Sequence, residues 1–291
     1  MMVNFSLLLP AVLNGVTTGA IYALIALGLT LIYGVLHIIN FAHGSLLMLA
    51  LYAAFFLYTL AGIDPYVAVL ILVPAFFVLG YGLQRFVIQP TSHGRDENIL
   101  LVTLGLAIII DNLALWLWTS TTRTIDTSYA FEVIDLGFAF IPLPKIIAFF
   151  GALAFAALLW ALITFTDLGR AIRAVARERD GARLVGIRVE HVYAMTFGIG
   201  TAAVAAAACF LLPTFYVTPQ VGYAFVLVAF TTVVLGGMGS FVGALSAGLL
   251  LGIVESLGGL YLGESLGQLG IFVIFILILL FRPMGLFGAR A

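Results

Sequence analysis

The sequence predicts an all-α protein, a polytopic transmembrane helical bundle with about eight membrane elements, some of them broken or re-entrant. The composition leads to this prediction. Of the 291 residues, 64% are hydrophobic and only 9% are charged, whereas a soluble domain carries about 25% charged residues. Such a chain has too few polar groups to cover its surface in water. We therefore expect residues 1–291 to form a single transmembrane domain.

Apolar segments follow one another along the whole chain, and a spanning helix needs about 20 mostly apolar residues. The candidate segments are residues 7–36, 46–61, 67–87, 99–118, 146–166, 192–212, 223–235, 241–257 and 266–281. The first is too long for one straight crossing. Segment 223–235 is too short to cross, because a helix of that length covers only about 20 Å.

Breaks in the apolar pattern follow the first and the shortest segments. Asn40 and His43 lie in the first break, and Gly236, Gly237 and Gly239 lie in the second. Broken helices at corresponding places in two halves point to a central pathway in transporters. We take these five residues as candidates for a translocation pathway. Two ordinary glycine-containing turns would give the same pattern.

Each break also has a structural interpretation. Irregular backbone at membrane depth must line a cavity or be buried in protein. His43 either contacts a substrate carboxylate or hydrogen-bonds the broken backbone. The small residues from Gly236 to Gly252 allow close helix approach, so they either line the pathway or form an interface with another helix or subunit.

Charged side chains inside a bilayer are costly and usually functional. Asp111 lies near the middle of segment 99–118, and Glu255 lies toward the end of segment 241–257. Asp111 either lines a polar pathway or bonds to a neighbouring helix and fixes packing. We add Asp111 to the candidate pathway residues.

The most concentrated charge lies between two apolar segments, at residues 167–190. Six of the 12 basic residues of the chain are arginines in this stretch, together with four acidic residues. Arg170, Arg173 and Arg177 share one face of a helix, which predicts a short amphipathic helix. Asp180 suits the N-terminal end of a second helical turn, and Gly186 suits its left-handed C-cap. Two short helices in a tight loop would form a rigid knob.

This loop has two interpretations. Arginines at a membrane surface satisfy the positive-inside rule and attract anionic lipid head groups. Acidic residues interspersed among them would weaken that attraction but suit a groove on a water-soluble protein. We favour a docking surface.

The positive-inside rule predicts the orientation. The loop 167–190, residues 85–97 and the tail with Arg282 and Arg290 should be cytoplasmic. The stretch 119–144 carries Arg123 against three acidic residues and suits the outer face. The N-terminus then lies outside if the first segment crosses once.

Several kinds of chemistry are excluded by the residues that they require. The one lysine, Lys145, follows Pro144, so the chain lacks the Gly-rich turn ending in Lys-Ser or Lys-Thr that binds nucleotides. The four histidines do not form a His-Glu-x-x-His zinc motif, and the single cysteine excludes an internal disulfide. We expect a protein that is not an enzyme and binds no metal, and a net charge of −1 gives no indication of a nucleic-acid partner.

Three longer stretches resemble a known family. They are GLTLIYGVLHIINFAHGSLLML (28–49), LGRAIRAVARERDGARLVGI (168–187) and VVLGGMGSFVGALSAGLLLG (233–252). Together they resemble the permeases of branched-chain amino acid ABC importers, in particular the shorter of the two permeases. Asp180, Ala182 and Gly186 are also similar to the Glu-Ala-Ala-x-x-x-Gly loop of ABC importer permeases, although Asp replaces Glu and Gly181 replaces the first Ala.

The resemblance implies a machine with several components in the bacterial inner membrane. This chain would pair with a second permease and act with two cytoplasmic ATPases and a periplasmic binding protein. ATP and Mg²⁺ would bind to the ATPases, so this chain would hold no cofactor. The loop would couple ATP hydrolysis to transport through Arg170, Arg173, Arg177, Arg179, Asp180, Ala182, Arg183 and Gly186.

Other functions stay open at this point. Related family members import urea, short amides or sugars. A secondary transporter would need a relay of embedded acids, for which the sequence offers little beyond Asp111 and Glu255. A passive channel for a small solute is the third alternative.

Overall fold

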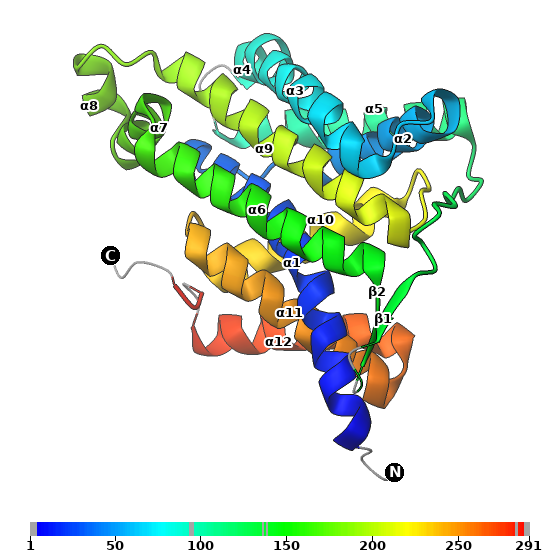
Figure 1. The fold of residues 1–291 in the computed structure, drawn as a ribbon. Coiled ribbons are helices and arrows are strands. Elements are labelled where there is room, and N and C mark those ends of the chain that lie inside the picture. Colours follow the sequence, from blue (N-terminus) through cyan, green and yellow to red (C-terminus); the bar gives the residue numbers. More distant parts are fainter. Residues whose placement is uncertain (1–4, 93–95, 136, 138, 283–284, 288–291) are drawn as a thin grey trace.

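The protein is a helical bundle (Figure 1), seen in a computed structural model that describes residues 5–92, 96–135, 137, 139–282 and 285–287. The helices of its body are α1 (Phe5–Leu36), α2 (His43–Ala61), α3 (Pro65–Gly82), α5 (Asp96–Trp118), α6 (Leu143–Phe165), α9 (Val189–Leu211), α10 (Val221–Gly236), α11 (Phe241–Leu262) and α12 (Glu264–Phe281). The shorter elements are the π-helical turn η1 (Leu83–Ile88), α4 (Gln89–Ser92), α7 (Asp167–Arg177), α8 (Arg179–Leu184), the 3-10 turn η2 (Leu212–Thr214), and the strands β1 (Val133–Asp135) and β2 (Phe140–Pro142).

Seven helices in the described part of the chain are long and apolar enough to cross a membrane by length and composition. They are Leu7–Leu36, His43–Ala61, Pro65–Thr91, Asn98–Trp118, Leu143–Phe165, Val189–Thr214 and Phe241–Leu262. Two shorter apolar helices, Val221–Gly236 and Leu266–Phe281, accompany them. The prediction of a polytopic all-α membrane bundle is therefore confirmed. The long first segment is one continuous helix of 32 residues.

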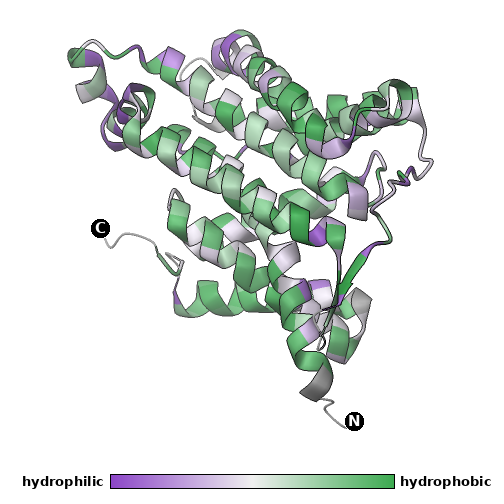
Figure 2. Cartoon of the chain, in the orientation of Figure 1, coloured by the Kyte–Doolittle hydropathy of each residue, from purple (hydrophilic) through white to green (hydrophobic). Residues whose placement is uncertain are grey.

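Helices α1 and α9 form the centre of the bundle. α1 packs against α11, α9, α6 and α10, and α9 packs against α3. Their side chains, such as Leu24 and Phe197, are fully buried. The surrounding helices α3, α5 and α6 are predominantly hydrophobic (Figure 2). They expose apolar side chains, among them Leu70, Trp116 and Leu158. Lipid is an apolar solvent, so these outward faces need no polar cover in a membrane.

Glycines set the spacing between α1 and α11. A methyl group added to Gly15 would lie 2.6 Å from the Cα of Ile253, and one on Gly252 would lie 2.3 Å from the carbonyl oxygen of Gly15. Helices in membranes associate through close packing of small residues. Larger side chains at these positions would force the two helices apart.

A small hairpin precedes α6, in the stretch that the sequence analysis treated only as an outer loop. β1 and β2 pair antiparallel, with Val133 opposite Pro142 and Asp135 opposite Phe140. The hairpin lies at the end of the bundle where α1 begins, whereas α7, α8 and the C-terminal end lie at the opposite end (Figure 1). Three-residue strands give too short a pattern to be recognised in a sequence.

Candidate functional site

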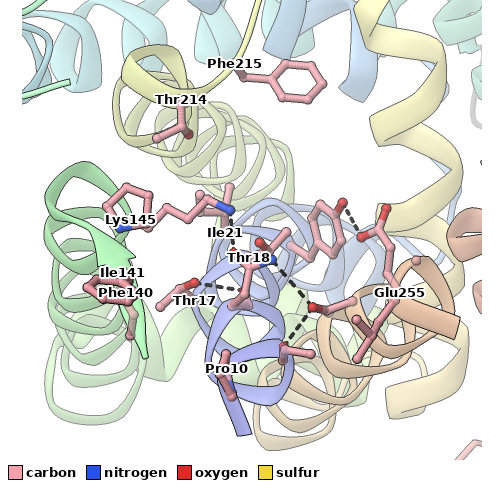
Figure 3. Close-up of a pocket in the computed structure, with 18 of the residues that line it drawn as sticks. Pro10, Thr17, Thr18, Ile21, Phe140, Ile141, Lys145, Thr214, Phe215 and Glu255 are labelled. Carbon is pink, nitrogen blue, oxygen red and sulfur yellow. Dashed lines mark hydrogen bonds between the residues drawn. The ribbon is translucent and has the colours of Figure 1, made fainter. Parts of the chain in front are cut away.

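A cavity of about 770 Å³ opens between α1, α6 and α11 at the hairpin end of the bundle (Figure 3). Strand β2 and the end of α9 complete its wall. Apolar side chains line much of it, including Ile21, Ile141, Leu211 and Phe215. This volume lies within the range of about 300–1,000 Å³ that is usual for small-molecule sites.

Polar side chains from three helices meet in this cavity. Lys145, near the start of α6, donates from Nζ to Oδ1 of Asn14 on α1 at 2.5 Å. Tyr22 of α1 donates its hydroxyl to Oε2 of Glu255 on α11 at 2.6 Å. Ser256 donates to the carbonyl oxygen of Ala11 at 2.7 Å, and so ties α11 to α1 beside the charged groups. A basic and an acidic group therefore share one mostly apolar cavity.

Asn40 and His43 lie in the break between α1 and α2, and both are fully buried. The Asn40 side chain accepts a hydrogen bond from the backbone N–H of Ala42 at 3.1 Å. His43 Nε2 lies 2.9 Å from the carbonyl oxygen of Ile25, in the middle of α1. Asn40 thus satisfies a backbone group in the break, and His43 ties the start of α2 to the middle of α1. Neither side chain belongs to the described lining of the cavity.

The start of α2, directly after the break, packs against the start of α10. A methyl group added to Gly44 would lie 2.2 Å from the carbonyl oxygen of Gly222. α2 begins beside the middle of α1, so it enters the bundle part-way along that helix. The ring of Tyr22 packs edge-on against Phe225 of α10, at 6.2 Å between ring centroids. Two helix starts therefore meet inside the bundle.

Asp111 lies on α5 and is almost completely buried, at 8% exposed. Its carboxylate interacts electrostatically with Tyr223 at the start of α10. Its Oδ1 atom has no hydrogen-bond partner in the described part of the chain. The structure thus places Asp111 close to the start of α10.

The glycines that follow α10 form a tight turn at the opposite end of α1 from the cavity. Gly237 and Gly239 have φ angles of 95° and 83°, which favour glycine. A methyl group on Gly236 would lie 2.4 Å from the carbonyl carbon of Gly243. The tail folds back onto this turn, where the N–H groups of Leu286 and Phe287 donate to the carbonyl oxygens of Leu235 and Gly236 at 2.7 and 3.2 Å.

The second candidate site is the charged knob formed by α7, α8 and the turn after them, residues 167–186. Hydrophilic residues gather there in Figure 2. Ile172, Val175 and Ala182 are buried and hold the knob against the bundle. Thr166 caps α7 by accepting from the N–H of Gly169 at 3.0 Å. The knob is therefore anchored by an apolar face, as the helical spacing of its residues predicts.

The arginines of the knob differ in their surroundings. Arg170 pairs with Asp167, and Arg183 pairs with Asp180 and Glu190. Arg173 donates to the carbonyl oxygen of Ile163 and so satisfies the end of α6. Arg179 lies over the ring of Tyr193, with its guanidinium carbon 5.7 Å from the ring centroid.

Arg177 and the tip of the knob face outward. Arg177 is exposed and has no ion-pair partner among the described residues. Leu184 and Val185, directly before the left-handed Gly186, are 89% and 76% exposed. Pairs of exposed apolar residues surrounded by charges suit a protein interface. The sequence analysis concentrated on the arginines and missed these two residues.

Comparison with known proteins shows the family. Residues 11–281 match a family described as branched-chain amino acid transport system / permease component. This chain belongs to that permease family. It is 35% identical to the high-affinity branched-chain amino acid transport system permease protein BraD of Pseudomonas aeruginosa, over 96% of this chain and 95% of the relative. It is 33% identical to LivH of Escherichia coli, a permease protein of the same description, over 98% of this chain and 97% of the relative.

A more distant relative has the same kind of printed description. The probable branched-chain amino acid transport permease protein LivH of Methanocaldococcus jannaschii is 29% identical over 91% of this chain and 88% of its own length. The family and the seven long apolar helices make this permease a multi-pass membrane protein.

The six predicted pathway residues fall into two groups in this permease. Asn40, His43 and Asp111 lie around the place where α2 and α10 begin, whereas Gly236, Gly237 and Gly239 lie at the end of α10 and in the turn after it. The described lining of the cavity contains none of them and instead contains Asn14, Tyr22, Lys145 and Glu255. The only lysine of the chain, next to an apolar segment, was a signal in the sequence for this site.

Proposed function

We propose that this chain is a membrane permease subunit of an ATP-driven ABC importer. It forms, with a second permease, the translocation pathway for branched-chain or similar hydrophobic amino acids. Two cytoplasmic ATPases drive the cycle, and a periplasmic binding protein delivers the amino acid. The family match and the printed descriptions of the relatives support the substrate class.

The observation that carries this proposal is the anchored knob with an apolar tip. Buried Ile172, Val175 and Ala182 fix the knob to the bundle, so movement of a bound partner is transmitted to α6 and α9. Leu184 and Val185 provide an apolar anchor for a groove on an ATPase, and Arg177 lies on the exposed face of the knob. Buried apolar anchors dominate the binding energy of interfaces, while charges around them set specificity.

The docking role of the knob also fixes the orientation of the chain in the membrane. If the knob docks on ATPases, it is cytoplasmic, and the end of α12 lies at the same end of the bundle (Figure 1). Arg282 directly follows the last residue of α12. Arg290, also expected to be cytoplasmic, lies outside the described residues. The hairpin and the cavity then face the periplasm, where a binding protein would release its amino acid.

Reconstitution tests the proposal. The chain is assembled with the second permease and the ATPases in proteoliposomes, and uptake of radiolabelled L-leucine is measured with the binding protein, with and without ATP. We expect uptake only when ATP and all components are present. Uptake without ATP would contradict the proposal and favour a secondary transporter or a channel. ATP-driven uptake of urea or short amides, but not of leucine, would contradict the substrate class.

Variants of the tip test the docking role. Leu184→Asp with Val185→Asp places charges in the apolar contact, and we expect a loss of ATP-driven uptake of about tenfold or more, since an interface anchor contributes 2 kcal/mol or more. Leu184→Met with Val185→Ile keeps the apolar character and serves as the control. Unchanged uptake and unchanged co-purification of the ATPases in the Asp variant would show that the partner docks elsewhere.

A further inference from the structure

The cavity contains two opposite charges, Lys145 and Glu255, at positions that are unfavourable for the stability of the fold. Lys145 is the third residue of α6, so its positive charge lies at the positive end of the helix dipole, which is unfavourable. Glu255 lies within the apolar helix α11 and is half-buried. Residues that violate such local rules are commonly found at functional sites.

The two charges are close but do not pair directly. Lys145 and Glu255 interact electrostatically, yet they do not form an ion pair of 4 Å or less in the described part of the chain. Each is held by a neutral group of α1 instead, Lys145 by Asn14 and Glu255 by Tyr22. Figure 3 shows them coming from elements on either side of α1.

Both groups keep unused hydrogen-bonding capacity. A lysine ammonium has three donors, and Lys145 uses one of them for Asn14. In the described part of the chain, Oε2 of Glu255 accepts a hydrogen bond from Tyr22. The other carboxylate oxygen, Oε1, stays available for a ligand. The cavity therefore presents one cation and one anion that can each bind a further charged group.

Apolar side chains adjoin the two charges. Ile21, Leu211, Phe215 and Leu260 line the same cavity. A small molecule with a carboxylate, an ammonium group and a hydrophobic side chain matches this lining. Charge-assisted hydrogen bonds are about twice as strong as neutral ones and would orient such a molecule.

We propose that this cavity binds the transported amino acid as a zwitterion, with its carboxylate at Lys145 and its ammonium group at Glu255. The hydrophobic side chain lies against the apolar lining. This inference rests on the proposed function, because it assigns a binding site in this chain to the amino acid that the importer moves. The alternative is that both charges only brace α6 and α11 against α1.

Analogues that lack one charge separate the two interpretations. Binding of L-leucine, leucinamide and 4-methylpentanoate is measured on the assembled transporter in nanodiscs, without binding protein, by saturation-transfer NMR. Leucinamide has no carboxylate for Lys145, and 4-methylpentanoate has no ammonium group for Glu255. We expect both analogues to bind more weakly than L-leucine.

Each variant should weaken the binding only of compounds that carry the group it contacts, which gives a crossed pattern between variants and analogues. We expect Lys145→Gln to weaken L-leucine binding about tenfold and to leave leucinamide binding unchanged. Glu255→Gln should weaken L-leucine binding by a similar factor and leave 4-methylpentanoate binding unchanged. A bracing role would change the affinity for all three compounds together. Glu132→Gln, at an exposed acid outside the cavity, is the control.

The outcomes also separate this inference from the proposed function. ATP-driven leucine uptake by the wild-type transporter, without measurable leucine binding at the cavity or without the crossed pattern, would overturn the zwitterion site and leave the importer intact. Absence of ATP-driven leucine uptake in the complete wild-type system would overturn the proposed function itself.

Discussion

At the scale of single residues, buried polar side chains tie different segments of the bundle to one another. His43 lies against the carbonyl oxygen of Ile25, and Asn40 accepts from the N–H of Ala42. An unpaired polar group costs more in lipid than in water because no solvent can replace its partner. Asp111 and Tyr223 form a comparable contact between two helices.

The Asp111 contact gives a first prediction. Asp111→Leu removes the carboxylate that interacts with Tyr223, and we expect a loss of about 1 kcal/mol in stability, seen as a lower melting temperature in detergent. Tyr223→Phe removes the hydroxyl group on the other side of this contact, so the double variant should cost no more than the larger single change. Normal expression, stability and leucine uptake in Asp111→Leu would contradict a role in packing and in transport.

A second prediction concerns the outer stretch before α6. Tyr129 donates to Oδ2 of Asp64, which caps α3, at 2.6 Å. Burial, with the hydrogen bond and the charge of Asp64, raises the pKa of Tyr129. The folded protein therefore holds the phenol proton more tightly than the unfolded chain, where tyrosine titrates near pH 10. The contact therefore makes its full contribution to the stability of the folded state below about pH 10. This contribution falls as the pH rises above that value.

Thermal unfolding at several pH values checks this second prediction. Tyr129→Phe should lower stability by about 0.5–1 kcal/mol at neutral pH, because the partly exposed bond to a charged group is lost. The difference between wild type and variant should shrink above about pH 10. A difference that stays constant up to pH 11 would show that Tyr129 titrates alike in the folded and unfolded states, so that its pKa is not raised and it contributes only by packing.

At the scale of elements, the knob depends on one close approach. A methyl group added to Gly169 would lie 2.0 Å from the carbonyl oxygen of Ile163 at the end of α6. α7 can therefore turn back against α6 only with glycine at this position. The exposed Arg170 and Arg177 follow on the same helix, so their placement depends on this contact.

A third prediction follows for that glycine. Gly169→Ala should displace α7 from α6, reduce ATP-driven uptake about tenfold and speed tryptic cleavage at the knob arginines, since the displaced helix loses its packing. Gly181→Ala is the matched control in α8, because its added methyl group would meet only the flexible side chain of Glu178, at 3.1 Å. Equal cleavage and uptake in the two variants would show that the α6–α7 contact is not required.

At the scale of the whole molecule, the bundle has two chemically different ends. One end carries the hairpin, beside the cavity that β2 lines, and the other carries the charged knob and the end of α12 (Figure 1). The apolar helices between them cross the bilayer. The proposed importer requires the knob end in the cytoplasm, where ATP is hydrolysed.

A fourth prediction is this orientation. The only cysteine, Cys209, is buried and is first replaced by alanine. Val185→Cys and Phe131→Cys then place single thiols at sites that are 76% and 85% exposed, at opposite ends. A membrane-impermeant maleimide should label the Phe131→Cys variant in intact spheroplasts and the Val185→Cys variant only after permeabilisation. The reverse pattern would contradict the coupling mechanism.

Much of this structure could be predicted from local sequence. Runs of apolar residues predict the spanning helices, because each must satisfy its own backbone hydrogen bonds in lipid. The spacing of Ile172 and Val175 predicts the buried face of the knob, and glycine at position 186 predicts the end of α8. These features depend on residues a few positions apart.

The cavity could not be predicted in this way. Asn14 and Ser256, or Tyr22 and Glu255, are separated by more than 230 residues in the sequence and meet only because glycines bring α1 and α11 together. The sequence analysis assigned Asn40, His43, Asp111 and the α10 glycines to one pathway, whereas the structure places the first three near the starts of α2 and α10 and the glycines at the other end of α10. Local hydrophobicity and charge along the chain are enough to locate the helices and the charged loop. Which polar groups face one another depends on how distant helices pack, and so it emerges only in the folded bundle.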